Sequence, residues 1–203
     1  MPPLFKGKRS IQKCKERTVS GGVVNQVDAV KIYIEYIRYG ARRSTAQRIS
    51  GISTMQSKQI YLELMGEPPK GGRNTTTWKA IVGPGHQLAI PAQKFLGAYL
   101  TQCGERIYSS KQIYGVLEAY KAYLAIHSQD PVILSLDKAY FIASCLWDGA
   151  EEAHVSSCLH CAATFPSLYP MADQCHVCAH AESASGFSLK KRRSRASVRR
   201  LTA

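Results

Sequence analysis

Four of the seven cysteines fall in one short segment, CLHCAATFPSLYPMADQCHVC, at residues 158–178. They form two Cys-x-x-Cys pairs, and thirteen residues separate Cys161 of the first pair from Cys175 of the second. A Cys-x-x-Cys turn presents two sulfurs about one tetrahedral edge apart, so two such turns supply the four thiolates that zinc prefers. The segment therefore predicts a small zinc-ribbon-like module that holds one structural Zn²⁺ through Cys158, Cys161, Cys175 and Cys178.

Other chemistries for the four cysteines fit the pattern less well. A single iron, as in rubredoxin-like sites, takes the same four-thiolate geometry, and the spacing leaves that alternative open. A thioredoxin-like motif needs one Cys-x-x-Cys in a βαβ setting, which this chain does not show. A zinc deaminase needs His-x-Glu before Pro-Cys-x-x-Cys, whereas His180 and Glu182 follow the cysteines here. Because a closed four-thiolate site leaves no open coordination position, we expect a structural metal and no enzyme activity.

The remaining cysteines and the nearby histidines have predicted places outside this ligand set. Cys14, Cys103 and Cys145 are expected to be unligated, the last two as small apolar residues in helices. With four thiolates available, the histidines are expected to support the ligands, to face solvent or to face phosphate. They are His154, His160, His176 and His180.

Before the cysteine segment, apolar residues recur at helical spacing and predict a mainly α body. One stripe is formed by Val27, Val30, Ile34 and Ile37, and Gly40 follows it as a helix end. Further on, the Gly- and Pro-rich residues 66–77 predict a loop.

The second half of the body carries three more helical signals. Phe95 and Tyr99 lie one turn apart in a helix that Pro91 starts or kinks. A stripe of Ile113, Leu117, Tyr120 and Leu124 predicts the next helix. For the last helix before the cysteines, the predicted N-cap is Asp130, the first helical residue is Pro131, and Gly149 lies just past the end.

Six tyrosines on these helices suggest a partner surface. Aromatic side chains with a polar end are enriched at protein interfaces, although burial in the chain's own core is the competing explanation. The residues are Tyr33, Tyr36, Tyr39, Tyr114, Tyr120 and Tyr123.

The net charge of +13 is concentrated at the two ends of the chain. Residues 1–18 hold six Lys or Arg against one Glu, and residues 186–203 hold seven with no acidic residue, while the intervening residues are nearly balanced. Basic arms of this kind suit a polyanion, because each neutralised phosphate releases condensed counterions. With no apolar run of about 18 residues to cross a bilayer and no signal peptide, we expect a cytoplasmic, nucleic-acid-binding chain without membrane association.

These signals divide the chain into four predicted regions. Residues 1–23 form a basic N-terminal arm, and residues 24–150 form an α-helical body that binds a partner and DNA. Residues 151–182 form the zinc-binding module, and residues 183–203 form a basic tail expected to be disordered until it meets a polyanion.

The stretch RRSTAQRISGISTMQSKQIYLEL, residues 42–64, has the outline of a helix-turn-helix, with a turn near Gly51 and Ser53 as N-cap of the second helix. In that motif the second helix begins at the base edges and the first crosses the backbone. Two short helices joined by glycine are also common in α-domains without DNA contacts. The DNA-binding prediction places Gln56, Lys58 and Gln59 near the groove and Arg42, Arg43 and Arg48 near phosphates. The tail adds Lys190, Lys191, Arg192, Arg193 and Arg195 as further phosphate contacts.

The order of motifs from about Val24 to Cys178 resembles the FlhC family, a subunit of the bacterial flagellar master transcriptional activator. Its most distinctive parts are YGAR, the Y-x-E-L-x-G helix end that runs into PPKG, the Tyr-rich AYKAYL, and SSC-x-x-C followed by C-x-x-C. The resemblance implies a heteromeric complex, a heterohexamer, with an FlhD-like subunit. It also implies zinc on the four cysteines, and binding to duplex promoter DNA to engage RNA polymerase.

The resemblance leaves the target genes open. The basic segment before Val24 is longer than the family's usual N-terminus, and residues 73–87 depart from the family pattern. We expect a DNA-binding activator of flagellar class 2 operons. The alternatives are an activator of conjugation or mobile-element genes, and a zinc-ribbon adaptor that binds protein or RNA.

Overall fold

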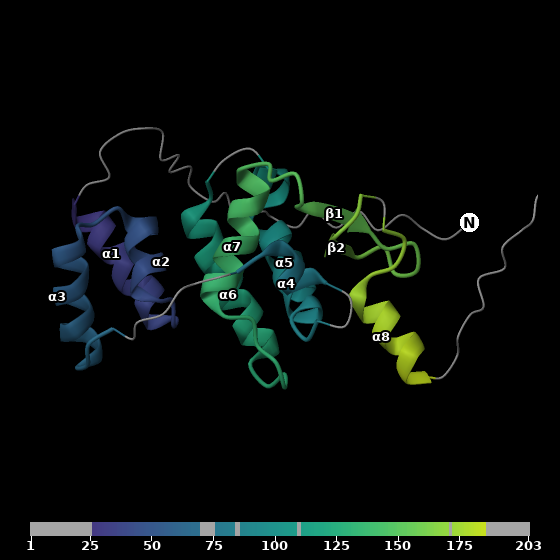
Figure 1. Cartoon of the computed structure of the whole chain (residues 1–203), viewed down its shortest axis with the longest axis horizontal. Coiled ribbons are helices and arrows are strands. Elements are labelled where there is room, and N and C mark those ends of the chain that lie inside the picture. The colour runs from purple at the N-terminus through teal and green to yellow at the C-terminus, as the bar shows by residue number, and fades with distance from the viewer. Residues whose placement is uncertain (1–25, 70–75, 84–85, 109–110, 171, 186–203) are drawn as a thin grey trace, which may run out of the picture.

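The structure is a computed structural model that describes residues 26–69, 76–83, 86–108, 111–170 and 172–185, and it confirms the predicted mainly helical fold (Figure 1). At one end lie α1 (Gln26–Arg38), α2 (Arg43–Ser50) and α3 (Thr54–Met65). The centre holds α4 (Trp78–Val82), α5 (Ala89–Cys103), the 3-10 turn η1 (Gly104–Tyr108), α6 (Ile113–His127) and α7 (Leu136–Trp147). At the other end are β1 (His154–Ser157), β2 (Thr164–Ser167) and α8 (His176–Ser185). No helix in these ranges has the length and apolar content needed to span a membrane.

The two-helix segment has the predicted boundaries. Gly51 ends α2 with a φ of 74°, a left-handed conformation that costs glycine little. Ser53 then caps α3, because its side chain accepts from the Gln56 backbone N–H while the Gln56 side chain accepts from the Ser53 N–H. Two adjacent local signals therefore fix the turn.

The buried face of α1 differs from the predicted stripe. Its buried residues are Ala29, Ile32, Tyr33, Tyr36 and Ile37, whereas Val27 is 56% exposed and Val30 and Ile34 are half-buried. The buried face is shifted by about one residue from the predicted stripe, because the rings of Tyr33 and Tyr36 are buried in the core and each hydroxyl donates to a backbone carbonyl. Tyr33 donates to the Ser57 carbonyl at 2.6 Å, and Tyr36 donates to the Ile113 carbonyl at 2.8 Å.

This burial contradicts most of the predicted tyrosine interface. Tyr33, Tyr36, Tyr120 and Tyr123 lie in the chain's own core, and Tyr39 packs partly against it. Only Tyr114, which is 41% exposed, keeps a substantial free surface among the six. Tyrosine is amphipathic, so its spacing alone did not distinguish a core face from a partner surface.

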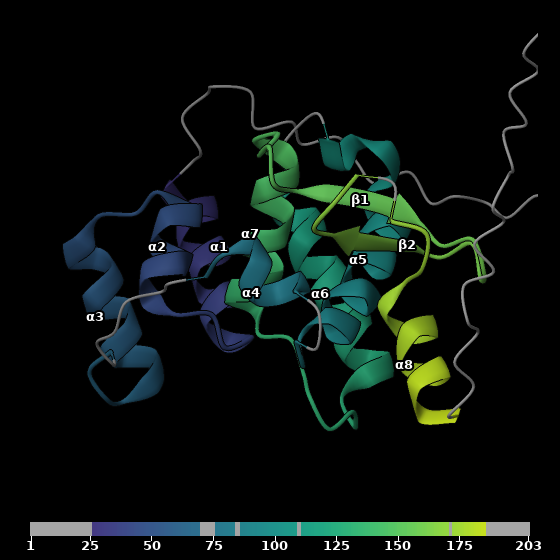
Figure 2. The same ribbon diagram turned by 45° about the vertical axis from the view of Figure 1, so that its right-hand side comes forward.

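The central layer is built on the packing of α5 against α6 (Figure 2). α5 begins at Ala89, two residues before the predicted start, and Pro91 lies in its first turn, where its missing N–H is not needed. One turn further, Phe95 and Tyr99 stack with ring centroids 5.8 Å apart, and Tyr123 of α6 meets Phe95 edge-on at 6.5 Å. The predicted stripe on α6 is confirmed at its centre, where Leu117 is buried. Its two end residues, Ile113 and Leu124, are only partly buried.

The predicted N-cap at Asp130 is wrong. α7 begins at Leu136 after Ser135, whose backbone is extended, because two tyrosines of α6 hold the backbone of Leu134 just before it. Tyr120 donates to the Leu134 carbonyl at 2.9 Å, and the Leu134 N–H donates to the Tyr123 hydroxyl at 3.0 Å. The predicted helix end is correct, since Gly149 follows α7 with a φ of 60°.

The cysteine module is attached to the body through α4, a short helix that the sequence patterns did not predict. Its Trp78 is fully buried and donates its indole N–H to the Ser167 carbonyl of β2 at 2.8 Å. β2 also packs along α5, and α8 contacts the same helix. The module is therefore joined to the helical body across a packed interface (Figures 1 and 2).

Candidate functional site

The first cysteine pair lies in the loop of a β-hairpin. β1 and β2 pair antiparallel, with Ser157 opposite Thr164, so Cys158 and Cys161 fall in the connection between them. The Cys158 N–H donates to the Ala163 carbonyl and the Ala162 N–H donates to the Cys158 carbonyl, both at 2.9 Å. Ala162 has a φ of 57°, which lets the chain turn sharply after the second thiol. This turn directs both sulfurs to the same side.

The second pair lies at the beginning of α8. Cys175 directly precedes the helix and Cys178 belongs to its first turn. The Leu159 N–H donates to the Asp173 carbonyl at 2.9 Å, which joins the two cysteine turns through the backbone. Cys158 and Cys175 are buried with Phe165 in a small core of their own, and Cys161 is exposed.

The four sulfurs converge as the spacing predicted. All four Sγ atoms lie within 4.8 Å of one another, and the Sγ atoms of Cys161 and Cys175 are 3.7 Å apart. Four sulfurs about 2.3 Å from a central ion would be separated by about 3.8 Å along each tetrahedral edge. The cluster therefore fits one metal ion with four thiolate ligands.

Backbone N–H groups prepare the buried Cys158 sulfur for negative charge. Burial raises the pKa of the Cys158 thiol, but N–H donors of Cys175, Cys161 and His160 outweigh it and lower that pKa to about 6. The Cys175 N–H reaches the Cys158 sulfur at 3.3 Å, and the Cys178 N–H reaches the Cys175 sulfur at 3.4 Å. Thiol hydrogen bonds from Cys175 and Cys161 raise the pKa of Cys178 to about 12. Crowded thiols of this kind favour a cation that replaces their protons.

The residues predicted to lie outside the ligand set do so wherever the structure describes them. Among the described residues, the metal-competent group contains the four cysteines and no histidine. His176 supports the module instead, with Nε2 2.9 Å from the Pro166 carbonyl and its ring edge-on to Phe165. Cys103 and Cys145 are buried in α5 and α7, and Cys14 lies outside the described residues.

The helix-turn-helix residues divide into those with internal contacts and those that face outward. Arg43 donates to Gln47 at 2.9 Å and to the Ser57 hydroxyl at 2.8 Å, so its guanidinium is partly used in holding α2 to α3. Gln56 forms the capping box, and Gln59 donates to Glu63 at 3.0 Å.

Lys58 and the other two arginines are more exposed. Lys58 lies on the outer side of α3, whose only buried residue is Ser57. Arg48 lies over the Tyr140 ring at 5.5 Å, and Arg42 lies 3.9 Å from Asp137. The predicted tail residues at 190–195 lie outside the described residues.

α3 also carries an apolar outer surface that the sequence reasoning missed. Met55, Leu62, Leu64 and Met65 are 80%, 51%, 38% and 48% exposed. The sequence does contain a signal for this surface. The apolar residues of α3 are distributed around the helix, and they are more numerous than the single face that packs toward α1 and α2 can bury. Because α3 exposes these apolar side chains together with Lys58, it can contact a protein as well as nucleic acid.

A comparison with known protein families gives a match that covers most of the chain. A family model described as flagellar transcriptional activator (FlhC) matches residues 19–194, which include every described element and all four clustered cysteines. No curated protein matches the chain.

Proposed function

The chain belongs to the FlhC family of flagellar transcriptional activators, and from that premise we propose that it is the DNA-binding subunit of a cytoplasmic activator complex. The match over residues 19–194 is the observation that carries this proposal. In the proposed complex an FlhD-like protein is the second subunit, duplex promoter DNA is the ligand, and RNA polymerase is engaged at flagellar class 2 operons.

The metal that we propose for the cysteine cluster is one zinc ion. Four thiolates with tetrahedral spacing suit zinc and close its coordination sphere, so the ion would stabilise the hairpin and the beginning of α8. This role is structural: Cys158, Cys161, Cys175 and Cys178 would hold the ion, and the module would fix where the basic tail leaves the fold.

The partner proposal is supported by the outer surface of α3 and the DNA proposal by the basic residues. Exposed apolar side chains at positions 55, 62, 64 and 65 lie beside Lys58 on the same short helix. An FlhD-like subunit that covered these side chains would leave the arginines of α2 and both terminal arms for phosphate contacts.

A mixing experiment tests the assignment. The chain is purified alone and together with an FlhD-like protein, and each preparation is titrated with labelled duplex promoter DNA and with structured RNA. We expect co-purification and saturable duplex binding by the complex. Binding of structured RNA without duplex DNA would favour the zinc-ribbon adaptor instead, while binding only to promoters of transfer genes would favour the conjugation activator.

A further inference from the structure

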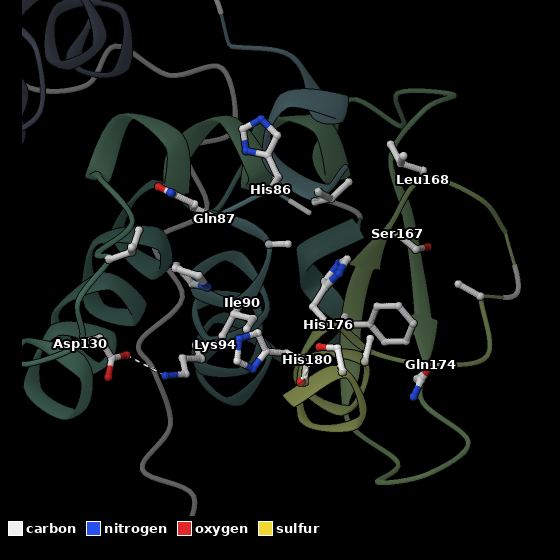
Figure 3. Close-up of a pocket in the computed structure, with 18 of the residues that line it drawn as sticks. His86, Gln87, Ile90, Lys94, Asp130, Ser167, Leu168, Gln174, His176 and His180 are labelled. Atoms are coloured by element: carbon white, nitrogen blue, oxygen red, sulfur yellow. Dashed lines mark hydrogen bonds and ion pairs between the residues drawn. The ribbon is translucent and has the colours of Figure 1, made fainter. Parts of the chain in front are cut away.

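A hollow of about 820 Å³ lies where the cysteine module meets the helical body (Figure 3). Its walls come from the start of α5, the segment between α6 and α7, β2 and α8. These segments are far apart in the sequence, so the hollow is a product of the tertiary fold. Its volume lies in the range of sites for small molecules, roughly 300–1,000 Å³.

Most of the lining is apolar. Val82, Ile90 and Val132 come from the body, and Phe165 and Leu168 come from β2 and the residue after it. Such a lining favours a ligand with a hydrocarbon or aromatic portion, because that portion leaves water on binding.

The polar side chains of the hollow include one lysine and three histidines beside hydroxyl, amide and carboxylate groups. Lys94 lies on its floor next to His180 in Figure 3, and His86 and His176 lie above them. The acidic residue among the lining side chains, Asp130, already accepts from Lys94 Nζ at 2.7 Å and lies 3.2 Å from His127 Nδ1.

Two observations indicate unmet donor capacity in these walls. An ammonium group carries three N–H donors, and the Asp130 contact uses one of those on Lys94. The Gln174 Nε2 atom in the module wall is buried without a hydrogen-bond partner. A ligand that brings acceptor oxygens would therefore find donors here.

We propose that this hollow binds an amphipathic monocarboxylate, with its apolar part against Ile90 and Phe165 and its carboxylate at Lys94. The ligand contacts α5 of the body and β2 of the cysteine module, so it ties the two together. It is a small-molecule site that the proposed transcriptional role does not require, and it stands or falls independently of that role.

Binding of decanoate to the metal-loaded full chain tests the proposal, with decanol as the uncharged probe. Titration calorimetry below the micellar concentration is expected to show one saturable decanoate site and weaker decanol binding. Lys94→Met is expected to weaken decanoate about tenfold, because it removes a charge-assisted hydrogen bond, and to leave decanol unchanged. Lys121→Met is the matched control, since Lys121 is also paired with carboxylates and its side chain is 30% exposed against 29% for Lys94.

A second pair of variants localises the site. Ile90→Trp fills the hollow and is expected to abolish binding of both probes. Ile126→Trp makes the same change in a smaller hollow between α5 and α6 and is expected to leave binding intact. No saturable decanoate binding, equal effects of the two lysine variants, or full binding by Ile90→Trp would each overturn the proposal.

Discussion

At the scale of single residues, close packing and sulfur chemistry decide most of what is specific to this chain. The six cysteines within the described residues have different environments: four converge on a metal-sized centre, and Cys103 and Cys145 are packed into helices. Burial raises the pKa of Cys145 to about 11, with Glu152 and Asp148 adding to the effect. Cys145 is therefore a neutral apolar filler at physiological pH, whereas backbone N–H donors lower the pKa of Cys158 in the cluster to about 6.

This difference predicts opposite outcomes for two cysteine-to-serine substitutions. Cys175→Ser removes a fully buried thiol of the four-cysteine cluster, so we expect a lower metal content and faster hydrogen exchange from about residue 150 onward. Cys145→Ser should leave the metal content unchanged, because its sulfur belongs to α7. Elemental analysis of both purified proteins measures the effect. One tightly held ion per chain in Cys175→Ser would exclude the four-thiolate site.

Gly115 of α6 faces Cys103 and Tyr99 of α5. A Cβ built there would collide with the Cys103 sulfur and lie 3.2 Å from the Gln112 Cβ. Gly115→Ala should therefore lower the free energy of unfolding by about 1–3 kcal/mol, although alanine is otherwise the better helix former.

The sign of that effect is expected to reverse when the sulfur is removed. In a Cys103→Ala background, Gly115→Ala should raise the free energy of unfolding by about 0.5–1 kcal/mol, because the gain in helix propensity is no longer outweighed by the collision. Denaturant titrations of the four proteins in this cycle measure both values. A penalty of the same size in both backgrounds would assign the cost to another neighbour of Gly115.

At the scale of elements, α2 and α3 are fixed to the body from one side. Both carboxylate oxygens of Asp137 at the start of α7 accept from the Arg42 backbone N–H, at 3.2 and 3.3 Å, just before α2 begins. Asp137 is only 7% exposed. Arg48 over the Tyr140 ring joins α2 to α7 a second time. The orientation of the predicted DNA-binding helices therefore depends on α7.

Substitution of Asp137 should loosen this attachment without changing the helices themselves. Asp137→Ala leaves the Arg42 N–H without its acceptor and should cost about 1–3 kcal/mol of stability. Asp137→Asn retains one acceptor oxygen and should cost less. We expect hydrogen exchange to accelerate in α1–α3 and to stay unchanged in α8. Uniform acceleration over the chain would show that Asp137 supports the whole core.

At the scale of the whole molecule, the cysteine module and the body are coupled through Trp78. Its indole N–H bond to the Ser167 carbonyl joins α4 to β2, whereas the other tryptophan, Trp147, donates to the Tyr99 hydroxyl within the body at 2.7 Å. A change in the module therefore reaches Trp78 before it reaches Trp147.

Metal removal should change the fluorescence emission of Trp78 and leave that of Trp147 nearly unchanged. In a Trp147→Phe protein, chelation should shift the emission of Trp78 as its buried environment opens to water. In a Trp78→Phe protein, the emission of Trp147 should change little. Fluorescence during a chelator titration provides the measurement, and equal shifts in both proteins would indicate that the whole chain unfolds with the metal.

The basic tail gives a prediction for DNA binding by the complex. Seven Lys or Arg without an acidic residue at 186–203 suit phosphate binding that carries no sequence information. Deleting residues 188–203 should weaken specific and non-specific duplexes together. It should also flatten the salt dependence by up to about 0.9 log unit for each phosphate that the tail no longer neutralises. Gel shifts at several salt concentrations test this, and loss of discrimination with an unchanged salt slope would show that the tail reads sequence.

Features encoded within a few residues were predictable from the sequence. The two cysteine pairs, the Gly51 turn, the Ser53 cap and the mainly helical body were each predicted from neighbouring residues, and the structure confirms them. Such signals depend on local backbone geometry and on ligand spacing, which distant parts of the chain alter little.

Features that depend on packing between distant residues were decided only by the tertiary structure. The tyrosines of α1 enter the core because the carbonyl acceptors of Ser57 and Ile113 lie there. Asp130 accepts a hydrogen bond from Lys94 and does not cap α7, whose N-cap is Ser135. Trp78 was overlooked because the partner that buries it is 89 residues away. The hollow beside α8 exists only where four separate segments meet. Amphipathic and polar side chains satisfy several environments equally well, so the choice among them is made by whichever partners the fold brings within reach.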